Sequence, residues 1–259
     1  MTEKLNHTPE EFLLPGERLD DLQCNGLKLI QRPDAFRFGT DSVLLADFAA
    51  PRKGDRAVDL GTGTGAIALL MAAHKPGLHV DAVEIQPEIA DMTRRSVQLN
   101  HMEESVTVHE MDMRSAWRTI GAGLRSLVVC NPPYGRSGAA LESVADAKRI
   151  ARHEGDLTPS EIARSASMLL KNGGRFCVIY PAPRAFEMMQ AMQDNHLAPK
   201  RIRTVHGVEG RAPKFVLMDA VKGGGPGLHW LEPLTLRHPD GTFTAEWHRI
   251  YDPKETAEA

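Results

Sequence analysis

The stretch Arg56-Ala-Val-Asp-Leu-Gly-Thr-Gly-Thr-Gly-Ala-Ile-Ala-Leu-Leu-Met-Ala-Ala-His74 decides the fold that this sequence predicts. Residues 56–60 have the pattern of a strand, residues 61–65 form a glycine-rich loop, and the apolar residues 66–74 are typical of a buried helix. A strand, a glycine turn and a helix in this order open many α/β domains that bind a nucleotide-like ligand.

Strands and helices continue to alternate after this unit, which predicts an α/β fold with a doubly wound, Rossmann-like sheet covered by helices on both faces. We expect seven strands in a mostly parallel sheet, with an antiparallel strand in the terminal pair. The expected strands are residues 56–60, 79–85, 105–110, 127–130, 174–180, 199–207 and 213–222. Further helices are expected at residues 87–100, 158–171 and 185–195.

Three regions make up the expected domain plan: an N-terminal hairpin and helix extension (1–50), the main domain (51–222) and a C-terminal extension packed on the same domain (223–259). Asn25-Gly26 lies between two alternating runs and predicts a β-hairpin. Thr40 or Asp41 is the expected cap of a helix over residues 42–49 that stops at Pro51. The run Gly223-Gly-Gly-Pro-Gly227 indicates a turn, although such a loop could also hold an anion.

Composition excludes several classes of protein. The chain has 259 residues, ordinary hydrophobic content and a net charge of −3, so any nucleic acid must bind a local patch. The start lacks the apolar core of a signal peptide, and no apolar run is long enough to span a membrane. Three cysteines lie far apart, and no cysteine–histidine cluster suggests a metal. We expect a cytoplasmic protein without a metal, and the sequence leaves the oligomeric state open.

The glycine-rich loop predicts a cofactor site. Glycines let the backbone approach a ligand, and the following helix presents unpaired N–H groups. Glu84 ends the next strand, nineteen residues after Gly65, where an acid can hold both hydroxyls of a ribose. The spacing of Gly61, Gly63 and Ala66 also fits a dinucleotide site. The acid before the first glycine and the third glycine at Gly65 favour S-adenosylmethionine, whose cationic groups suit an acidic site.

Two further acids have alternative interpretations. Asp112 follows the third expected strand and could accept a hydrogen bond from the adenine amine of the cofactor, or cap a helix over residues 113–119. Asp59 could orient the amino group of the cofactor's methionine, or only hold the glycine loop in place.

Asn131-Pro132-Pro133-Tyr134 carries the chemistry that we expect. It follows an expected strand, so Asn131 lies at the carboxyl edge of the sheet beside the cofactor site. The Asn131 side-chain oxygen and the Pro132 carbonyl can each accept one N–H of a planar NH2 group. These bonds favour charge building up on that nitrogen and aim its lone pair at a methyl group. Tyr134 can stack on the flat target. The alternative is a rigid turn without a catalytic role.

These residues resemble the bacterial amino-group methyltransferases with an Asn-Pro-Pro-Tyr motif, and more closely the tRNA1(Val) adenine-N6 methyltransferase family. The resemblance rests on five blocks, which are Asp34-Ala-Phe-Arg-Phe-Gly-Thr-Asp-Ser-Val-Leu-Leu-Ala46, Asp59-Leu-Gly-Thr-Gly-Thr-Gly65, Asn131-Pro-Pro-Tyr134, Ala151-Arg-His-Glu154 and Lys222-Gly-Gly-Gly-Pro-Gly-Leu228. It implies a class I methyltransferase fold, a flipped adenosine beside the anticodon as target, and residues 37–41 near the methionine end of the cofactor.

Together, motif and resemblance give the expected site. The catalytic residues would be Asn131, Pro132 and Tyr134. The cofactor would bind Arg37, Gly39, Thr40, Asp59, Gly61, Thr62, Gly63, Gly65, Glu84, Ile85, Asp112, Met113 and Asn131. The substrate would bind Pro133, Tyr134, Arg152 and His153.

A local excess of basic residues supports an RNA partner. The stretch from Lys171 to Lys214 contains eight lysines and arginines but only three acids. Arg152 and His153 belong to a second basic group. A solvated surface would show the same pattern. We therefore predict methylation of an adenine amino group in tRNA by S-adenosylmethionine. The physics of the motif would also serve guanine N2 of ribosomal RNA or a glutamine amide. An NAD-dependent oxidoreductase would need a catalytic base that we do not find.

Overall fold

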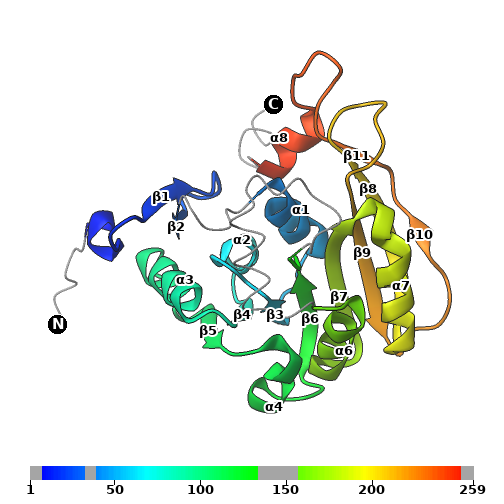
Figure 1. Ribbon diagram of the computed structural model, residues 1–259, viewed down its shortest axis with the longest axis horizontal. Helices are drawn as coiled ribbons and strands as arrows, with labels where there is room; N and C mark the ends of the chain where they lie inside the picture. The colour runs from blue at the N-terminus through cyan, green and yellow to red at the C-terminus, as the bar shows by residue number, and fades with distance from the viewer. Residues whose placement is uncertain (1–7, 33–38, 134–156, 252–259) are drawn as a thin grey trace.

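The computed structural model describes residues 8–32, 39–133 and 157–251. Its centre is a nine-stranded sheet in the order β10-β8-β9-β7-β6-β3-β4-β5, with β11 paired to β8 (Figure 1). Its strands are β3 (Arg56–Leu60), β4 (His79–Glu84), β5 (Val106–Glu110), β6 (Arg125–Cys130), β7 (Leu170–Pro181), β8 (Leu197–His206), β9 (Phe215–Lys222), β10 (His229–Trp230) and β11 (Leu234–Thr235). The seven expected strands are all present, and β9 alone among the described strands of this sheet runs antiparallel to its neighbours. The two-residue strands β10 and β11 were not expected.

Helices cover both faces of the sheet, as expected (Figure 1). One apolar cluster joins the sheet to α1, α2 and α3, and a second joins the opposite face to α4, α6 and α7. These helices are α1 (Thr40–Ala49), α2 (Ala66–His74), α3 (Pro87–Leu99), α4 (Ala116–Ile120), α6 (Pro159–Leu169) and α7 (Ala185–Asp194), and α8 (Ala245–Tyr251) lies in the C-terminal extension. Among the described residues, no helix has the length and apolar character needed to cross a membrane.

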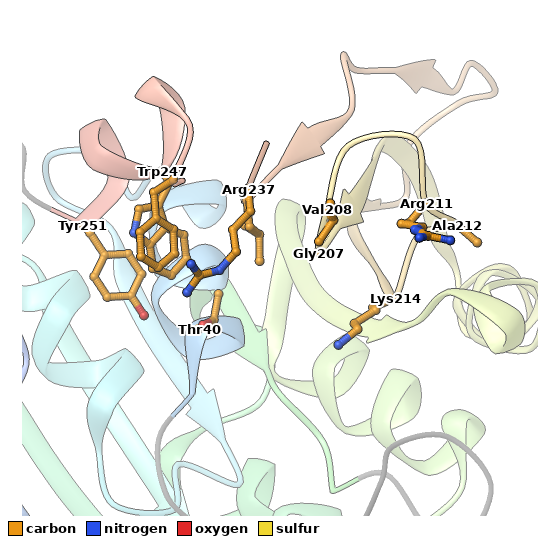
Figure 2. Close-up of a pocket in the computed structure, with 11 residues that line it drawn as sticks. Thr40, Gly207, Val208, Arg211, Ala212, Lys214, Arg237, Trp247 and Tyr251 are labelled. Carbon is orange, nitrogen blue, oxygen red and sulfur yellow. The ribbon is translucent and has the colours of Figure 1, made fainter. Parts of the chain in front are cut away.

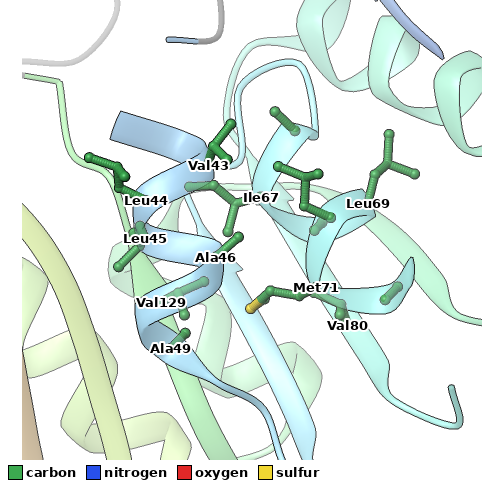
Figure 3. Close-up of a cluster of buried hydrophobic side chains, with 14 of the residues drawn as sticks. Val43, Leu44, Leu45, Ala46, Ala49, Ile67, Leu69, Met71, Val80 and Val129 are labelled. Atoms are coloured by element: carbon green, nitrogen blue, oxygen red, sulfur yellow. The ribbon is translucent and has the colours of Figure 1, made fainter. Parts of the chain in front are cut away.

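The helices α1 and α2 pack together at the centre of the first cluster (Figure 3). Both are apolar around most of their circumference, because each is enclosed by the sheet and by other helices. Leu45 and Met71 are fully buried there. Burying one such side chain stabilises the fold by roughly 1.5–3 kcal/mol. This core fixes the start of α1 and the start of α2 relative to the sheet.

The predicted hairpin is present as β1 (Arg18–Asp21) and β2 (Lys28–Gln31), although its loop is longer than a two-residue Asn-Gly turn. The chain turns at Asn25 and Gly26, which both have positive φ, and the Leu27 N–H donates to the Cys24 carbonyl at 2.9 Å, as expected for an Asn-Gly turn. The Leu22 N–H then donates to the Leu27 carbonyl at 3.0 Å. Asn100, at the end of α3, accepts from the Lys28 N–H at 2.9 Å and donates to its carbonyl at 2.6 Å. The hairpin is thereby attached to α3.

The expected cap of α1 was wrong. The N-cap is Gly39, whose carbonyl accepts from the Ser42 N–H at 3.1 Å, and Thr40 and Asp41 belong to the first turn of the helix. The Asp41 side chain accepts from the Ser42 N–H at 3.0 Å through Oδ1, and the contact of its second oxygen is described below. The helix ends at Ala49, before Pro51, as expected.

The C-terminal extension is built into the main core. Leu234 of β11 and Ile250 of α8 are 1% and 4% exposed and belong to the same cluster as α1 and α2. The glycine run at residues 223–227 is a turn. Lys200 Nζ donates to the carbonyl oxygen of Gly225 at 2.5 Å, so this loop faces a cation rather than an anion.

Candidate active site at the carboxyl edge of the sheet

The strand register brings the predicted motifs together. Leu60 of β3 is paired with Cys130 of β6 on one side and with Val83 of β4 on the other. The next residues along these strands, Gly61, Asn131 and Glu84, therefore emerge side by side. The order of the sheet reverses between β3 and β6, and ligands of open α/β sheets bind at such a switch point. The fold thus brings the glycine loop, Glu84 and Asn131 to one edge of the sheet, and cofactor binding there stays a prediction.

The glycine loop between β3 and α2 is held by Thr93 of α3. The Thr93 hydroxyl donates to the carbonyl of Gly63 at 2.6 Å. Gly65 has a φ of +89°, and a Cβ atom at this position would lie 2.6 Å from Thr93 Cγ2. A side chain at Gly65 would therefore be strained twice, by its backbone and by its neighbour. The loop keeps its backbone close to the crevice because it is packed from behind.

Glu84 is buried at the end of β4, with 4% exposure. Its carboxylate accepts from the N–H groups of Gly63 at 3.0 Å and Gln86 at 2.9 Å. Burial raises the pKa of Glu84, and these hydrogen bonds oppose the rise. A carboxylate has about four acceptor positions, so both oxygens retain capacity for ribose hydroxyls.

Asp59 lies fully buried one residue before the end of β3. It accepts from the Thr62 hydroxyl at 2.7 Å through Oδ2, while Oδ1 has no hydrogen-bond partner within the described chain. Burial raises the pKa of Asp59 to about 7, the bond from Thr62 opposes the rise, and the charge of Glu84 adds to it. A buried carboxyl group of this kind fits a cationic group such as the amino group of a bound S-adenosylmethionine.

Asp112 caps the turn that follows β5. Its carboxylate accepts from the Arg114 N–H at 2.8 Å and pairs with the Arg114 guanidinium at 2.6 Å. The capping alternative is therefore present in the structure, and contact with an adenine stays a prediction. Met113 lies beside the glycine loop, because its Cε atom is 3.0 Å from the position of a Cβ on Gly61.

Asn131 is half-buried, and its side chain is oriented by α1. Its Nδ2 donates to Asp41 Oδ2 at 3.0 Å. An ionised carboxylate can accept hydrogen bonds but cannot donate one. This contact therefore fixes the NH2 side of the amide against Asp41 and turns the carbonyl side away from it. The sequence offered no pattern for this contact, since ninety residues separate the partners. Pro132, the next residue, is buried.

The other predicted residues divide into two groups. Gly39, Thr40, Ile85 and Pro133 lie at the same edge of the sheet, at the start of α1 and after the ends of β4 and β6. Four residues fall outside the described part of the chain, namely Arg37, Tyr134, Arg152 and His153. In the described part, no group of three or more histidine, cysteine or acidic side chains could hold a metal ion.

Most of the basic cluster between Lys171 and Lys214 serves the fold. Arg175 and Arg201 both pair with the buried Asp219. Three more are bound by other groups: Arg184 by Glu187, Arg203 by Glu246 and Lys200 by backbone carbonyls. Lys171, Arg211 and Lys214 form no ion pair with a described acid. Five of the eight basic residues are therefore already bound by acids or backbone carbonyls of the described chain, and a role of the cluster in RNA binding stays a prediction.

The strand order, the glycine loop backed by Glu84, and Asn-Pro-Pro after β6 define a Rossmann-like methyltransferase. The methyltransferase small domain model matches residues 34–198. The chain is 31% identical to the tRNA1(Val) (adenine(37)-N6)-methyltransferase of Erwinia tasmaniensis, over 86% of this chain and 95% of that protein. It is 30% identical to the same enzyme of Aeromonas hydrophila, over 85% and 90%.

A crystal structure of a predicted O-methyltransferase from Agrobacterium tumefaciens has the same fold. Its TM-score is 0.68 at 23% identity, covering 82% of this chain and 96% of that chain. The chain belongs to the methyltransferase small domain family, and within it to the family of the tRNA1(Val) (adenine(37)-N6)-methyltransferases.

Proposed function

We propose that this protein transfers a methyl group from S-adenosylmethionine to the N6 amino group of an adenine in tRNA, the adenine at position 37 being the target. Its membership of the family supports the reaction, and the names of the relatives support the substrate. The observation that carries the proposal is the placement of Asn131 beside the glycine loop at the switch point. A tRNA substrate is found in the cytoplasm, where we expect the protein to act.

The residues present fit the cofactor. Glu84 would hold the ribose, Asp59 the methionine amino group, and the N–H groups at the start of α2 would face the carboxylate. When bound, S-adenosylmethionine supplies a methyl group on a positively charged sulfur. Two buried acids at the site favour such a cation.

Asn131 and Pro132 would hold the adenine amine. The amine is a weak nucleophile because its lone pair is delocalised into the ring. The Asn131 side-chain oxygen and the Pro132 carbonyl each accept one N–H, which stabilises the positive charge that develops on nitrogen. The Asp41 contact holds the NH2 side of the Asn131 amide, which leaves its oxygen for the adenine amine and supports this role. The surplus proton of the methylated nitrogen leaves to water.

An in vitro assay tests the substrate. Purified protein is incubated with S-adenosylmethionine and an unmodified tRNA1(Val) transcript, and the RNA is digested to nucleosides for mass spectrometry. We expect N6-methyladenosine, and none from a transcript with guanosine at position 37. Formation of N2-methylguanosine alone, or methylation of protein glutamine but not of RNA, would contradict the proposal.

The substitution Asn131→Ala tests the site. We expect kcat to fall by a factor of about 10² or more, because an acceptor of the reacting amine is lost. S-adenosylmethionine affinity, measured by calorimetry, should change less than about threefold. A parallel loss of cofactor affinity and turnover would show instead that Asn131 supports the fold of the crevice.

A further inference from the structure

A second cavity opens at the same edge of the sheet as Asn131. It has a volume of about 420 Å³, within the range of small-molecule sites. It lies between α8, the β8–β9 loop and Thr40, the first residue of α1 (Figure 2). Thr40 precedes Asp41, which contacts Asn131. The cavity is therefore connected to the candidate active site through two consecutive residues of α1.

Two chemically different walls face each other across the cavity (Figure 2). One wall is aromatic, since Trp247 stacks against Phe243 at 4.7 Å and against Tyr251 at 3.9 Å between ring centroids. The other wall is the β8–β9 loop, which carries Arg211 and Lys214. A flat, anionic ligand would find both an apolar surface and positive charge here.

The cations of the cavity lack acidic partners. No described acid pairs with Arg211 or Lys214, and none of the described lining residues is acidic. Arg237 stacks over the Phe243 ring at 3.7 Å, and its guanidinium donates to the carbonyl of Gly241 at 2.7 Å. The nearby acid Glu209 pairs with His238 at 3.3 Å. Three cations line the cavity and none of its described lining residues is acidic, which favours an anionic ligand.

The position of the basic wall separates these cations from the rest of the basic cluster. Phe215, the first residue of β9, pairs with Pro181 at the end of β7 and with Val205 near the end of β8. The β8–β9 loop therefore lies at the carboxyl edge of the sheet, where Asn131 also lies. Lys171 is near the opposite end of β7.

We propose that this cavity binds a nucleotide of the RNA next to the methylated base, with its phosphate against Arg211 and Lys214 and its sugar and base against the aromatic wall. Phosphates bind arginine and lysine, and bases pack on aromatic side chains. The inference rests on the proposed function and assigns to the C-terminal extension the task of holding the chain that flanks the target.

Charge removal tests the phosphate contact. The variants Arg211→Gln, Lys214→Gln and their double mutant are compared with Lys171→Gln, an exposed lysine from the same stretch of sequence. Affinity for the unmodified tRNA1(Val) transcript is measured at several salt concentrations, together with KM and kcat. We expect each pocket variant to weaken binding about three- to tenfold and to lower the salt slope by about 0.7 per lost contact. We expect the weaker binding to raise KM for the transcript rather than to lower kcat.

The control variant should keep the affinity and salt slope of the wild type. Calorimetry with S-adenosylmethionine and thermal melting verify that every variant is folded. Pocket variants that bind the transcript as Lys171→Gln does would overturn the inference. Weaker binding of free AMP by these variants with unchanged RNA binding would also overturn it, because the cavity would then serve a free nucleotide.

A second experiment locates the phosphate. Anticodon stem–loop RNAs with one neutral methylphosphonate within two nucleotides of the target are tested against wild type and Lys214→Gln. We expect one position at which the two changes are not additive, since both remove the same contact. Full additivity at all positions would count against the proposal. If the wild type methylates no tRNA, the proposed function fails; if it does and the pocket variants are normal, only this inference fails.

Discussion

At the residue scale, Asp41 orients the Asn131 amide, and its loss should reduce turnover. The variant Asp41→Asn keeps the shape but can present an NH2 group to Asn131, so the amide is free to rotate. We expect kcat at saturating cofactor to fall about tenfold or more. Steady-state kinetics with the tRNA transcript measure this effect.

The matched control is Asp47→Asn, on the same helix. Asp47 faces Arg249 at 3.7 Å, away from the contact with Asn131. It should leave kcat within about twofold of the wild type. Equal kinetics for Asp41→Asn and Asp47→Asn would show that Asn131 does not need this hydrogen bond.

Asp59 should make cofactor binding depend on pH. Burial raises its pKa to about 7 in the free protein, and a cation beside it would favour the ionised form. Affinity for S-adenosylmethionine should therefore rise from pH 5.5 to 7, by up to about tenfold per pH unit. Glu84 also has a raised pKa and can contribute to the pH dependence. The contribution of Asp59 is therefore the difference in pH dependence between the wild type and Asp59→Asn. The same pH dependence in both proteins would mean that Asp59 only holds the glycine loop.

The same acid affects the stability of the protein without cofactor. A carboxyl whose pKa is higher in the folded than in the unfolded state stabilises the fold fully at pH values below its unfolded pKa, 3.8 for aspartate. That contribution is lost as the pH rises through about 7. Urea denaturation from pH 4 to 8 should thus show a smaller decline for Asp59→Asn than for the wild type.

At the element scale, the glycine loop depends on its packing against α3. Gly65→Ala should destabilise the protein by roughly 1–3 kcal/mol and weaken cofactor binding, because a Cβ meets Thr93 Cγ2 at 2.6 Å on a backbone with positive φ. Gly54→Ala is the control, since Gly54 has a similar φ of +82° but no atom within 4 Å of the new Cβ. Chemical denaturation compares the two variants.

A second substitution separates the backbone strain at residue 65 from the collision between its Cβ and Thr93 Cγ2. Thr93→Ser removes the Cγ2 methyl group and retains the hydroxyl that binds the Gly63 carbonyl. The double variant Gly65→Ala, Thr93→Ser should recover part of the lost stability. No recovery would mean that the backbone conformation alone accounts for the cost.

Elements were predictable where one local signal dominated. The apolar run of α2 and the Pro87 start of α3 lie where the sequence placed them. The N-cap of α1 was not predictable in this way. Asp41 has the residue type of a cap, but its carboxylate binds Asn131. The hairpin was predictable too, because Asn25 and Gly26 adopt the positive φ values that their turn requires, although the loop between the strands spans residues 22–27.

At the scale of the whole molecule, we propose that the C-terminal extension unfolds together with the main domain. Ile250→Ala should cost about 2–4 kcal/mol, because the side chain is 4% exposed and packs into the core that holds α1 and α2. Trp230→Ala, at a residue that is 67% exposed, should cost far less. Thermal unfolding should show one transition for both variants. A separate early transition for Ile250→Ala would indicate an independent tail.

The sequence by itself determined the alternation of strands and helices, the glycine loop, Glu84 and the Asn-Pro-Pro turn. Each of these features depends on a pattern within a short stretch of residues. Only the tertiary structure decided which distant side chains meet. It set Asp41 against Asn131, paired Arg175 and Arg201 with the buried Asp219, and placed Arg211 and Lys214 opposite Trp247. Such contacts depend on strand register and on the packing of helices over the sheet. Neither can be predicted from a short stretch of sequence.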